Sequence, residues 1–133
     1  MANALFNGGR EGFLDGSIDW DTNDIRVMLV LSAYVYDATD RVITDLGAVD
    51  NGRSVALGVK TVTNGVADAA DTTITVTAAA ASNALIVFQH TGVDLTARLI
   101  AYFDTATGLP FTPALAQVVT VQWDNGVNRI FRL

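Results

Sequence analysis

The chain has 133 residues, enough for one domain with its own hydrophobic core. It contains no cysteine and one histidine, which excludes disulfide scaffolds, cysteine-ligated zinc, thiol catalysis and a multi-histidine metal site within one chain. Fourteen acidic against eight basic residues (net charge −6) argue against a duplex-binding surface, and a charged fraction of only 17% favours a surface that other subunits partly cover.

The first sixteen residues are predicted to form a short helical arm, ahead of a single β domain over residues 17–133. Glycines weaken this helix by about 1 kcal/mol each relative to alanine, so we expect it to form only when docked on its own sheet or on a neighbouring subunit. We expect that deleting the arm leaves the β domain folded but abolishes assembly. The apolar positions that need a surface are Leu5, Phe6, Phe13 and Leu14.

No targeting segment and no apolar run long enough to span a bilayer is visible, so we expect a soluble protein made in a reducing compartment. Residues 24–31 are rich in valine, isoleucine and leucine, and this apolar run predicts a strand buried on both faces. Residues 37–50 are expected to form a loop with one turn of helix, and residues 54–59 a short strand. Asn64 and Gly65 predict a hairpin, because both central residues of a type I′ turn have positive φ.

Residues 72–77 alternate hydroxyl and apolar side chains, which predicts a half-buried strand with Ile74 and Val76 facing inward. The four alanines that follow are too few to hold a helix, and we expect a loop there. Two further apolar strands are predicted over residues 85–89 and 99–103.

A turn region over residues 104–113 is marked by Gly108, Pro110 and Pro113. Residues 118–133 read as a second hairpin around Asp124-Asn125-Gly126, with Trp123 and Phe131 as a cross-strand aromatic pair. Short strands at regular spacing, two hairpins and one weak helix indicate an all-β, antiparallel β-sandwich of jelly-roll or immunoglobulin-like character.

The densest acidic cluster is a candidate cation site. Asp19, Asp21 and Asn23 have the spacing that begins a calcium loop, but Asp24 stands where such a loop needs glycine and Val30 where it needs glutamate. A polar turn above a packed Trp20 is the favoured interpretation, and cation binding stays open.

No constellation favours an enzyme. The chain has one glutamate, its aspartates are scattered through loops, and its serines lack the context of a nucleophile elbow. His90 is interpreted as a strand-end residue bonded to backbone. We therefore predict no catalytic residue, no cofactor and no metal ligand.

Assembly is the function class that the residues favour. Tyr34 and Tyr36, at period two near a strand end, are candidate interface anchors. Seven arginines against one lysine suit Arg–Asp contacts between subunits, although codon bias explains the ratio equally well. The candidate interface comprises Leu5, Phe6, Arg10, Phe13, Leu14, Tyr34 and Tyr36.

Four strings carry a resemblance: MANALFNGGREGFLDGSIDW at the start, DIRVMLVL in the first long strand, VKTVTNGVADA at the first hairpin and TGLPFTPALAQVVTVQWDNGVNRIFRL at the end. By overall pattern they resemble a family of small virion structural proteins of tailed bacteriophages. The resemblance covers most of the chain, and residues 35–58 are its least similar part.

This resemblance implies a non-enzymatic subunit of the virion, best matched by a capsid decoration (cement) protein. Its partner would be the major capsid protein. It would form a homo-oligomer, a trimer in preference to a dimer. It would be made in the host cytoplasm and would lie on the capsid surface. No nucleic acid or membrane partner is expected. A tail, neck or fibre-associated subunit is the alternative. A glycan-binding tail-tip module and a small hydrolase with a buried carboxylate pair also stay open.

Overall fold

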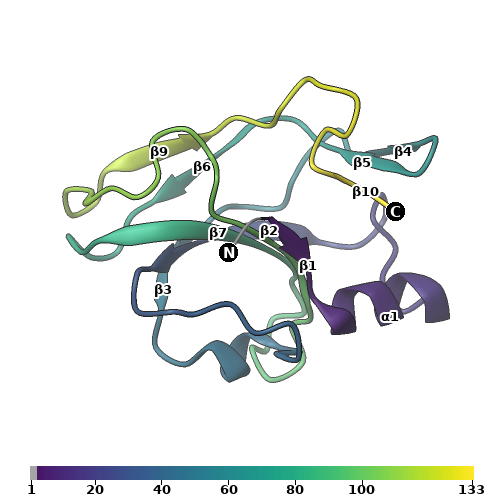
Figure 1. Cartoon of the computed structure of the whole chain (residues 1–133), viewed down its shortest axis with the longest axis horizontal. Helices are drawn as coiled ribbons and strands as arrows, with labels where there is room; N and C mark the ends of the chain where they lie inside the picture. Colours follow the sequence, from purple (N-terminus) through teal and green to yellow (C-terminus); the bar gives the residue numbers. More distant parts are fainter. Residues whose placement is uncertain (1–2) are drawn as a thin grey trace.

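The computed structural model of the chain describes residues 3–133, and its largest element is a five-stranded antiparallel sheet (Figure 1). The strand order is β1-β8-β7-β2-β3, so the central strands come from distant parts of the sequence. The strands are β1 (Ala4–Leu5), β8 (Leu99–Phe103), β7 (Ser82–Gln89), β2 (Ile25–Leu31) and β3 (Asp50–Arg53).

Strands β2 and β7 form the middle of the molecule because both are apolar on both faces. They pair from Ile25 opposite Gln89 to Leu31 opposite Ser82. Successive side chains point to opposite faces of the sheet, so Val27 and Leu29 join one hydrophobic cluster while Met28 joins the other. The predicted strand that is buried on both faces is confirmed.

Two smaller antiparallel sheets cover one face of the large sheet, which makes the molecule a sandwich (Figure 1). One sheet has the order β10-β5-β4, and the other pairs β6 with β9. Ile74, Val76 and Val121 of this layer pack in the same cluster as Val27 and Val87 of the large sheet. The strands are β4 (Thr61–Thr63), β5 (Val66–Asp68), β6 (Thr72–Thr75), β9 (Val118–Val121) and β10 (Phe131–Arg132).

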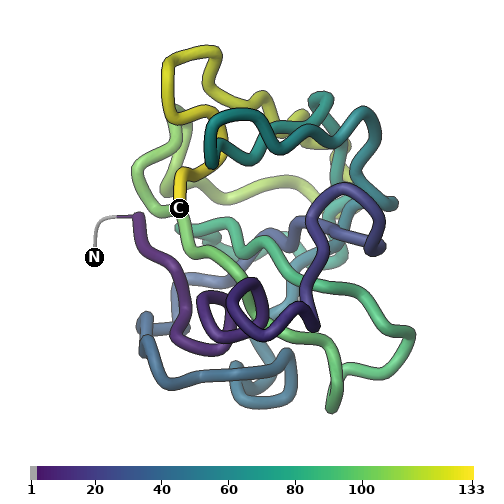
Figure 2. Tube along the Cα trace, turned by 90° about the vertical axis from the view of Figure 1, so that its right-hand side faces the viewer, coloured from purple at the N-terminus to yellow at the C-terminus, as the bar shows by residue number. Residues whose placement is uncertain are grey.

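On the other side of the large sheet lie the loop after β2 and a 3-10 turn, η1 (Ile43–Leu46), where a loop with one helical turn was predicted. Figure 2 shows the layers from the side, with the teal and yellow segments of the small sheets above and the purple and blue segments below. The all-β antiparallel sandwich with a single short helix, predicted from the sequence, is confirmed.

The N-terminal segment is built into this fold. Helix α1 (Asn7–Asp15) follows β1 and packs against β8, and Phe6 between them is fully buried. Its glycines permit that packing, since a Cβ on Gly9 would lie 2.8 Å from the carbonyl oxygen of Ile100. Deleting this segment would remove a strand and a core side chain, so on the structure we expect the deletion to destabilise the β domain as well.

The predicted strand over residues 54–59 is wrong, and β3 ends at Arg53. After it, Ser54 N–H donates to the Val27 carbonyl and Leu57 N–H donates to the Ile25 carbonyl. These single bonds hold the segment beside β2 without the alternating ladder that a strand requires. The bonds come from residues three apart in this segment and reach residues two apart in β2, so the pairing is irregular. A short apolar stretch in the sequence does not reveal such an irregularity.

The two predicted hairpins have different outcomes. The first is confirmed: β4 and β5 flank Asn64 and Gly65, whose φ angles are 56° and 75°. The second is wrong, since β9 pairs with β6 and β10 pairs with β5. Each arm finds its partner elsewhere in the chain, so the turn around Asp124-Asn125-Gly126 connects two different sheets.

The cross-strand pairing of Trp123 and Phe131 is wrong for the same reason. The Trp123 ring lies 6.4 Å from that of Phe103, whereas the Phe131 ring contacts Trp20 and Phe13. Residues 78–81 form no helix, as predicted, and Ile74 and Val76 are buried as expected.

Candidate functional site

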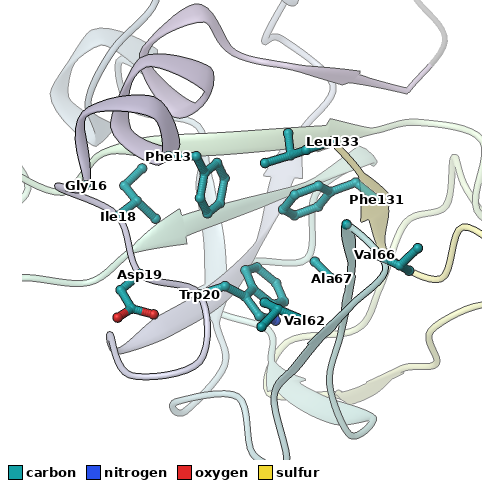
Figure 3. Close-up of a pocket in the computed structure, with 11 residues that line it drawn as sticks. Phe13, Gly16, Ile18, Asp19, Trp20, Val62, Val66, Ala67, Phe131 and Leu133 are labelled. Carbon is teal, nitrogen blue, oxygen red and sulfur yellow. The ribbon is translucent and has the colours of Figure 1, made fainter.

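An apolar groove opens between the end of helix α1 and the small sheet β10-β5-β4 (Figure 3). Its volume is about 310 Å³, within the lower range of pockets that hold a small ligand or a side chain. The residues that line it are Phe13, Gly16, Ile18, Asp19, Trp20, Val62, Gly65, Val66, Ala67, Phe131 and Leu133.

Three aromatic rings form the groove's inner surface. The Phe131 ring meets Trp20 with centroids 5.3 Å apart and lies 5.7 Å from Phe13. The Trp20 indole N–H donates to the carbonyl oxygen of Asp68 at 3.0 Å, which fixes the ring against β5. Figure 3 shows that Phe13 comes from the helix, Trp20 from the loop that follows it and Phe131 from β10. These contacts fix the positions of the rings that line the groove.

The rim of the groove exposes aliphatic side chains to solvent. Val62 on β4 is 56% exposed and Leu133 is 61% exposed. Strand β4 is also the edge of its sheet, so its outer backbone groups are unpaired within the described residues. An apolar groove beside an open strand edge is a surface that favours contact with another polypeptide.

The acidic turn beside the groove is organised by its own hydrogen bonds. Asn23 Oδ1 accepts from Asp19 N–H at 2.8 Å and from Gln89 Nε2 at 2.7 Å. Hydrogen bonds to Asp21 and Thr22 lower the pKa of Asp19, and the same contact raises the pKa of Asp21. Within residues 3–133 no group of three or more acidic or histidine side chains is placed to hold a metal ion.

The predicted interface residues of the N-terminal segment separate into different environments. Phe13 lines the groove, and Leu14 is 89% exposed beside it in sequence. Phe6 is fully buried, so its assignment to a partner surface is wrong, and Leu5 is half-buried against the core. Arg10 is exposed on α1, where its guanidinium contacts Asn7 Oδ1 at 3.4 Å.

The two predicted tyrosine anchors lie in a second place, at the end of β2. The Tyr34 hydroxyl donates to Asp40 Oδ2 at 2.8 Å, and the Tyr36 hydroxyl donates to the Leu5 carbonyl at 2.9 Å. Both rings approach Tyr102. Tyr34 is buried and Tyr36 half-buried, and neither lines the groove that contains Phe13.

Several arginines that could join subunits bind acids within the chain. Arg53 forms a bidentate pair with Asp94, at 2.8 and 2.9 Å, and also contacts Asp50 at 2.6 Å. Arg26 and Asp24 form a second two-bond pair. These pairs hold the pKa of Asp24 and Asp94 below the usual range.

His90 has the predicted place at a strand end, where its backbone N–H donates to the Asp24 carbonyl at 2.7 Å. Sequence reasoning missed most of the groove: Trp20 and Phe131 were interpreted as packing residues, and Val62 and Leu133 were not singled out. Because the groove joins residues from both ends of the chain, no local pattern marks it.

Within the described part of the chain, no helix is long and apolar enough to cross a membrane. Comparison of the chain with family models, with curated proteins and with solved structures found no match. The class that the fold defines is an all-β sandwich with an apolar groove beside an open strand edge.

Proposed function

We propose that this chain is a structural subunit of a tailed-bacteriophage virion, and specifically a decoration protein that binds the major capsid protein on the outside of the head. The observation that carries the proposal is the aromatic groove with its exposed aliphatic rim. It is a rigid surface suited to a side chain or segment of a neighbouring protein. The resemblance of the sequence to small virion proteins supplies the identity of that neighbour.

The surface outside the groove agrees with a subunit whose exterior is partly covered in the working state. Among residues 3–133, eleven large aliphatic side chains are more than half exposed. Scattered exposed apolar residues are normal on a monomer, so only the exposed side chains at the groove support the proposal. The exposed side chains are Leu14, Val35, Val55, Val59, Val62, Val93, Leu95, Leu115, Val118, Val127 and Leu133.

Weak contacts suffice for this role. A capsid presents many copies of one site, so an oligomeric decoration protein gains affinity by engaging several sites at once. A subunit that binds only the expanded shell stabilises that shell by mass action. We expect a closed homo-oligomer, trimer before dimer, because closed symmetry matches the symmetry axes of the shell.

The test is sedimentation of purified chain with capsid shells of the virus that encodes it. Replacing Val62 and Leu133 by serine places hydroxyls on the groove rim without touching the core. We expect this double variant to fold normally and to bind shells about tenfold more weakly or worse, the effect of losing roughly 1.4 kcal/mol or more at an interface. Val127→Ser is the matched control, since Val127 is 84% exposed and lies outside the groove.

Normal shell binding by the double variant would reject the groove as the contact. No binding of the unchanged protein to shells would reject the decoration role. Binding to tails or necks in the same experiment would favour the alternative, a tail, neck or fibre-associated subunit.

A further inference from the structure

The chain contains four Asn-Gly pairs, at positions 7–8, 51–52, 64–65 and 125–126. In such a pair the backbone nitrogen of the glycine can attack the asparagine side chain, because glycine has no side chain to block the approach. Whether the attack occurs in a folded protein depends on solvent access and on whether the backbone can reach the reacting conformation. The four pairs lie in four different settings.

Burial and hydrogen bonds restrain the pair at positions 51–52. Asn51 is fully buried, its amide donates to Ser82 Oγ at 2.9 Å, and its side-chain oxygen accepts from the Ala78 N–H at 2.8 Å. The Gly52 N–H, which would have to attack, donates to Asp50 Oδ1 at 2.8 Å. Both reacting groups of this pair are therefore held in place and closed to solvent.

Regular structure restrains two further pairs. Asn7 begins helix α1, and Gly8 is buried. Arg10 reaches Asn7 Oδ1 at 3.4 Å, but the helix fixes the backbone. Asn64 has a φ of 56° in the turn between β4 and β5, and the pairing of these strands fixes the turn on both sides. Ring closure needs rotation about the asparagine Cα–C bond, which a helix or a tight hairpin turn resists.

The pair at positions 125–126 has none of these restraints. It lies in the exposed loop between β9 and β10, which projects above the small sheets in Figure 1. Within residues 3–133, the backbone N–H and C=O of Asn125 and the N–H of Gly126 make no hydrogen bond. The glycine nitrogen is thus available to attack, and no backbone hydrogen bond opposes rotation into the reacting conformation.

A guanidinium is bound to the atom on which negative charge would develop. Arg129 Nη1 donates to Asn125 Oδ1 at 3.0 Å, and Arg129 Nε lies 3.9 Å from Asp68 Oδ2 at the end of β5. The Arg129 backbone N–H donates to the Gly126 carbonyl at 3.3 Å, which ties the arginine to the reacting pair. A cation on a carbonyl oxygen makes the carbon more electrophilic and stabilises the oxyanion that attack creates.

We propose that Asn125 is a site of spontaneous covalent modification, which closes to a succinimide with Gly126 and then opens to aspartate or isoaspartate. The Gly126 nitrogen forms a bond to Asn125 Cγ and gives its proton to water. The tetrahedral intermediate then expels Nδ2, which takes a proton from water and leaves as ammonia. Water next hydrolyses one of the two ring C–N bonds. Breaking the bond to Cγ leaves aspartate, and breaking the bond to the backbone carbonyl carbon leaves isoaspartate, in which the chain runs through Cβ.

The modification would alter the loop in two ways. Either product places a carboxylate beside the Arg129 guanidinium and adds one negative charge to the chain. Isoaspartate also lengthens the connection between β9 and β10 by one methylene, and β10 carries Phe131 of the apolar groove. The product therefore lies in the segment that positions one wall of the groove, although the chemistry itself is independent of the proposed virion role.

The test is incubation of the folded protein in mildly alkaline buffer, followed by peptide mapping with mass spectrometry at all four pairs. We expect position 125 to react about tenfold faster or more than positions 7, 51 and 64. In protein unfolded in urea, where the four pairs lose their different settings, we expect rates within a factor of about three of one another. Isoaspartyl methyltransferase with a labelled methyl donor checks that isoaspartate is among the products at position 125.

Variants of the loop test the part that each residue plays. Asn125→Gln should abolish the modification at this position, because the longer side chain would have to close a six-membered ring. Arg129→Gly removes the guanidinium, suits the φ of 46° at this position, and should slow the reaction about threefold or more. Arg129→Lys should recover part of the rate, which a change in loop flexibility would not explain. Arg132→Ala, at an exposed arginine outside the loop, is the matched control and should change nothing.

The proposal is overturned if position 125 reacts no faster than position 51 or position 64 in the folded protein. It is also overturned if the order of the four rates is the same in the folded and the unfolded protein, since the structure would then select nothing. A rate in Arg129→Gly equal to that of the Arg132→Ala control would remove the guanidinium from the mechanism.

Discussion

The ring of Phe131 meets the indole of Trp20 edge-on, with centroids 5.3 Å apart and planes at 86°. The contact joins strand β10 to the loop that follows helix α1, and it forms part of the inner surface of the apolar groove. Edge-to-face aromatic pairs add to the stability that area burial alone provides. One contact thus stabilises the fold and shapes the proposed interface.

Replacing Phe131 by alanine should therefore affect stability and shell binding together. Phe131 is half-buried, so we expect a loss of about 2 kcal/mol in the free energy of unfolding, below the 3–5 kcal/mol of a fully buried phenylalanine. Urea unfolding followed by tryptophan fluorescence measures this loss. An unchanged stability would mean that the Phe131–Trp20 contact does not hold β10 to the loop that follows α1.

The N-terminal segment should behave as part of the core. Phe6→Ala is expected to cost about 3–5 kcal/mol, because the side chain is fully buried and leaves a cavity. Leu14→Ala, eight positions further on, should change stability by no more than about 0.5 kcal/mol because Leu14 is solvent-exposed. Thermal or urea unfolding of the two variants checks the contrast. Equal small effects would restore the picture of a detachable arm.

Two adjacent glycines of α1 should respond to alanine in opposite directions. A Cβ on Gly9 would meet the Ile100 backbone at 2.8 Å, so Gly9→Ala should destabilise the protein by roughly 1–3 kcal/mol through overpacking. A Cβ on Gly8 has its nearest neighbour at 3.7 Å, so Gly8→Ala should be neutral or stabilise by up to about 1 kcal/mol through helix propensity. Calorimetric melting of both variants measures the two changes in stability. A stabilising effect of Gly9→Ala would contradict the close approach of α1 to β8.

The Arg53–Asp94 pair should make stability depend on pH at the acid end. Arg53 lowers the pKa of Asp94 in the folded state, so the pair's contribution is present above the unfolded pKa of about 3.9. That contribution is lost as pH falls through the folded pKa. Because Asp94 is about half exposed, the contribution at pH 7 should be less than about 1 kcal/mol.

Urea unfolding of Asp94→Asn and of the unchanged protein at pH 7 and pH 2.5 measures this. The variant should be less stable at pH 7, and the difference should shrink at pH 2.5 and in high salt. A difference of the same size at both values of pH would assign the effect to packing.

The parts of the fold that sequence reasoning reached are those decided locally. The run after Asp24 predicts β2 because apolar residues on both faces need cover on both sides. Asn64 and Gly65 predict their hairpin because the turn itself requires positive φ at both positions. These signals lie within a few residues of the structure that they specify.

The parts that it missed depend on partners distant in the chain. The turn around Asn125 has the composition of a hairpin, but β9 finds a better partner in β6 and β10 finds one in β5. The sequence assigned both Phe6 and Phe13 to a partner surface. The docking of α1 on β8 makes Phe6 a core residue and leaves Phe13 in the groove. The groove itself needs residues from both ends of the chain to meet.

The most direct test of the account is an electron microscopy map of the purified virus particle in which this chain is located. We predict that the sandwich lies on the outer surface of the head in symmetric clusters, with the groove formed by Phe13, Trp20 and Phe131 filled by a segment of the major capsid protein. A particle whose head carries no copy of the chain, or a copy whose groove faces solvent, would contradict the central claim.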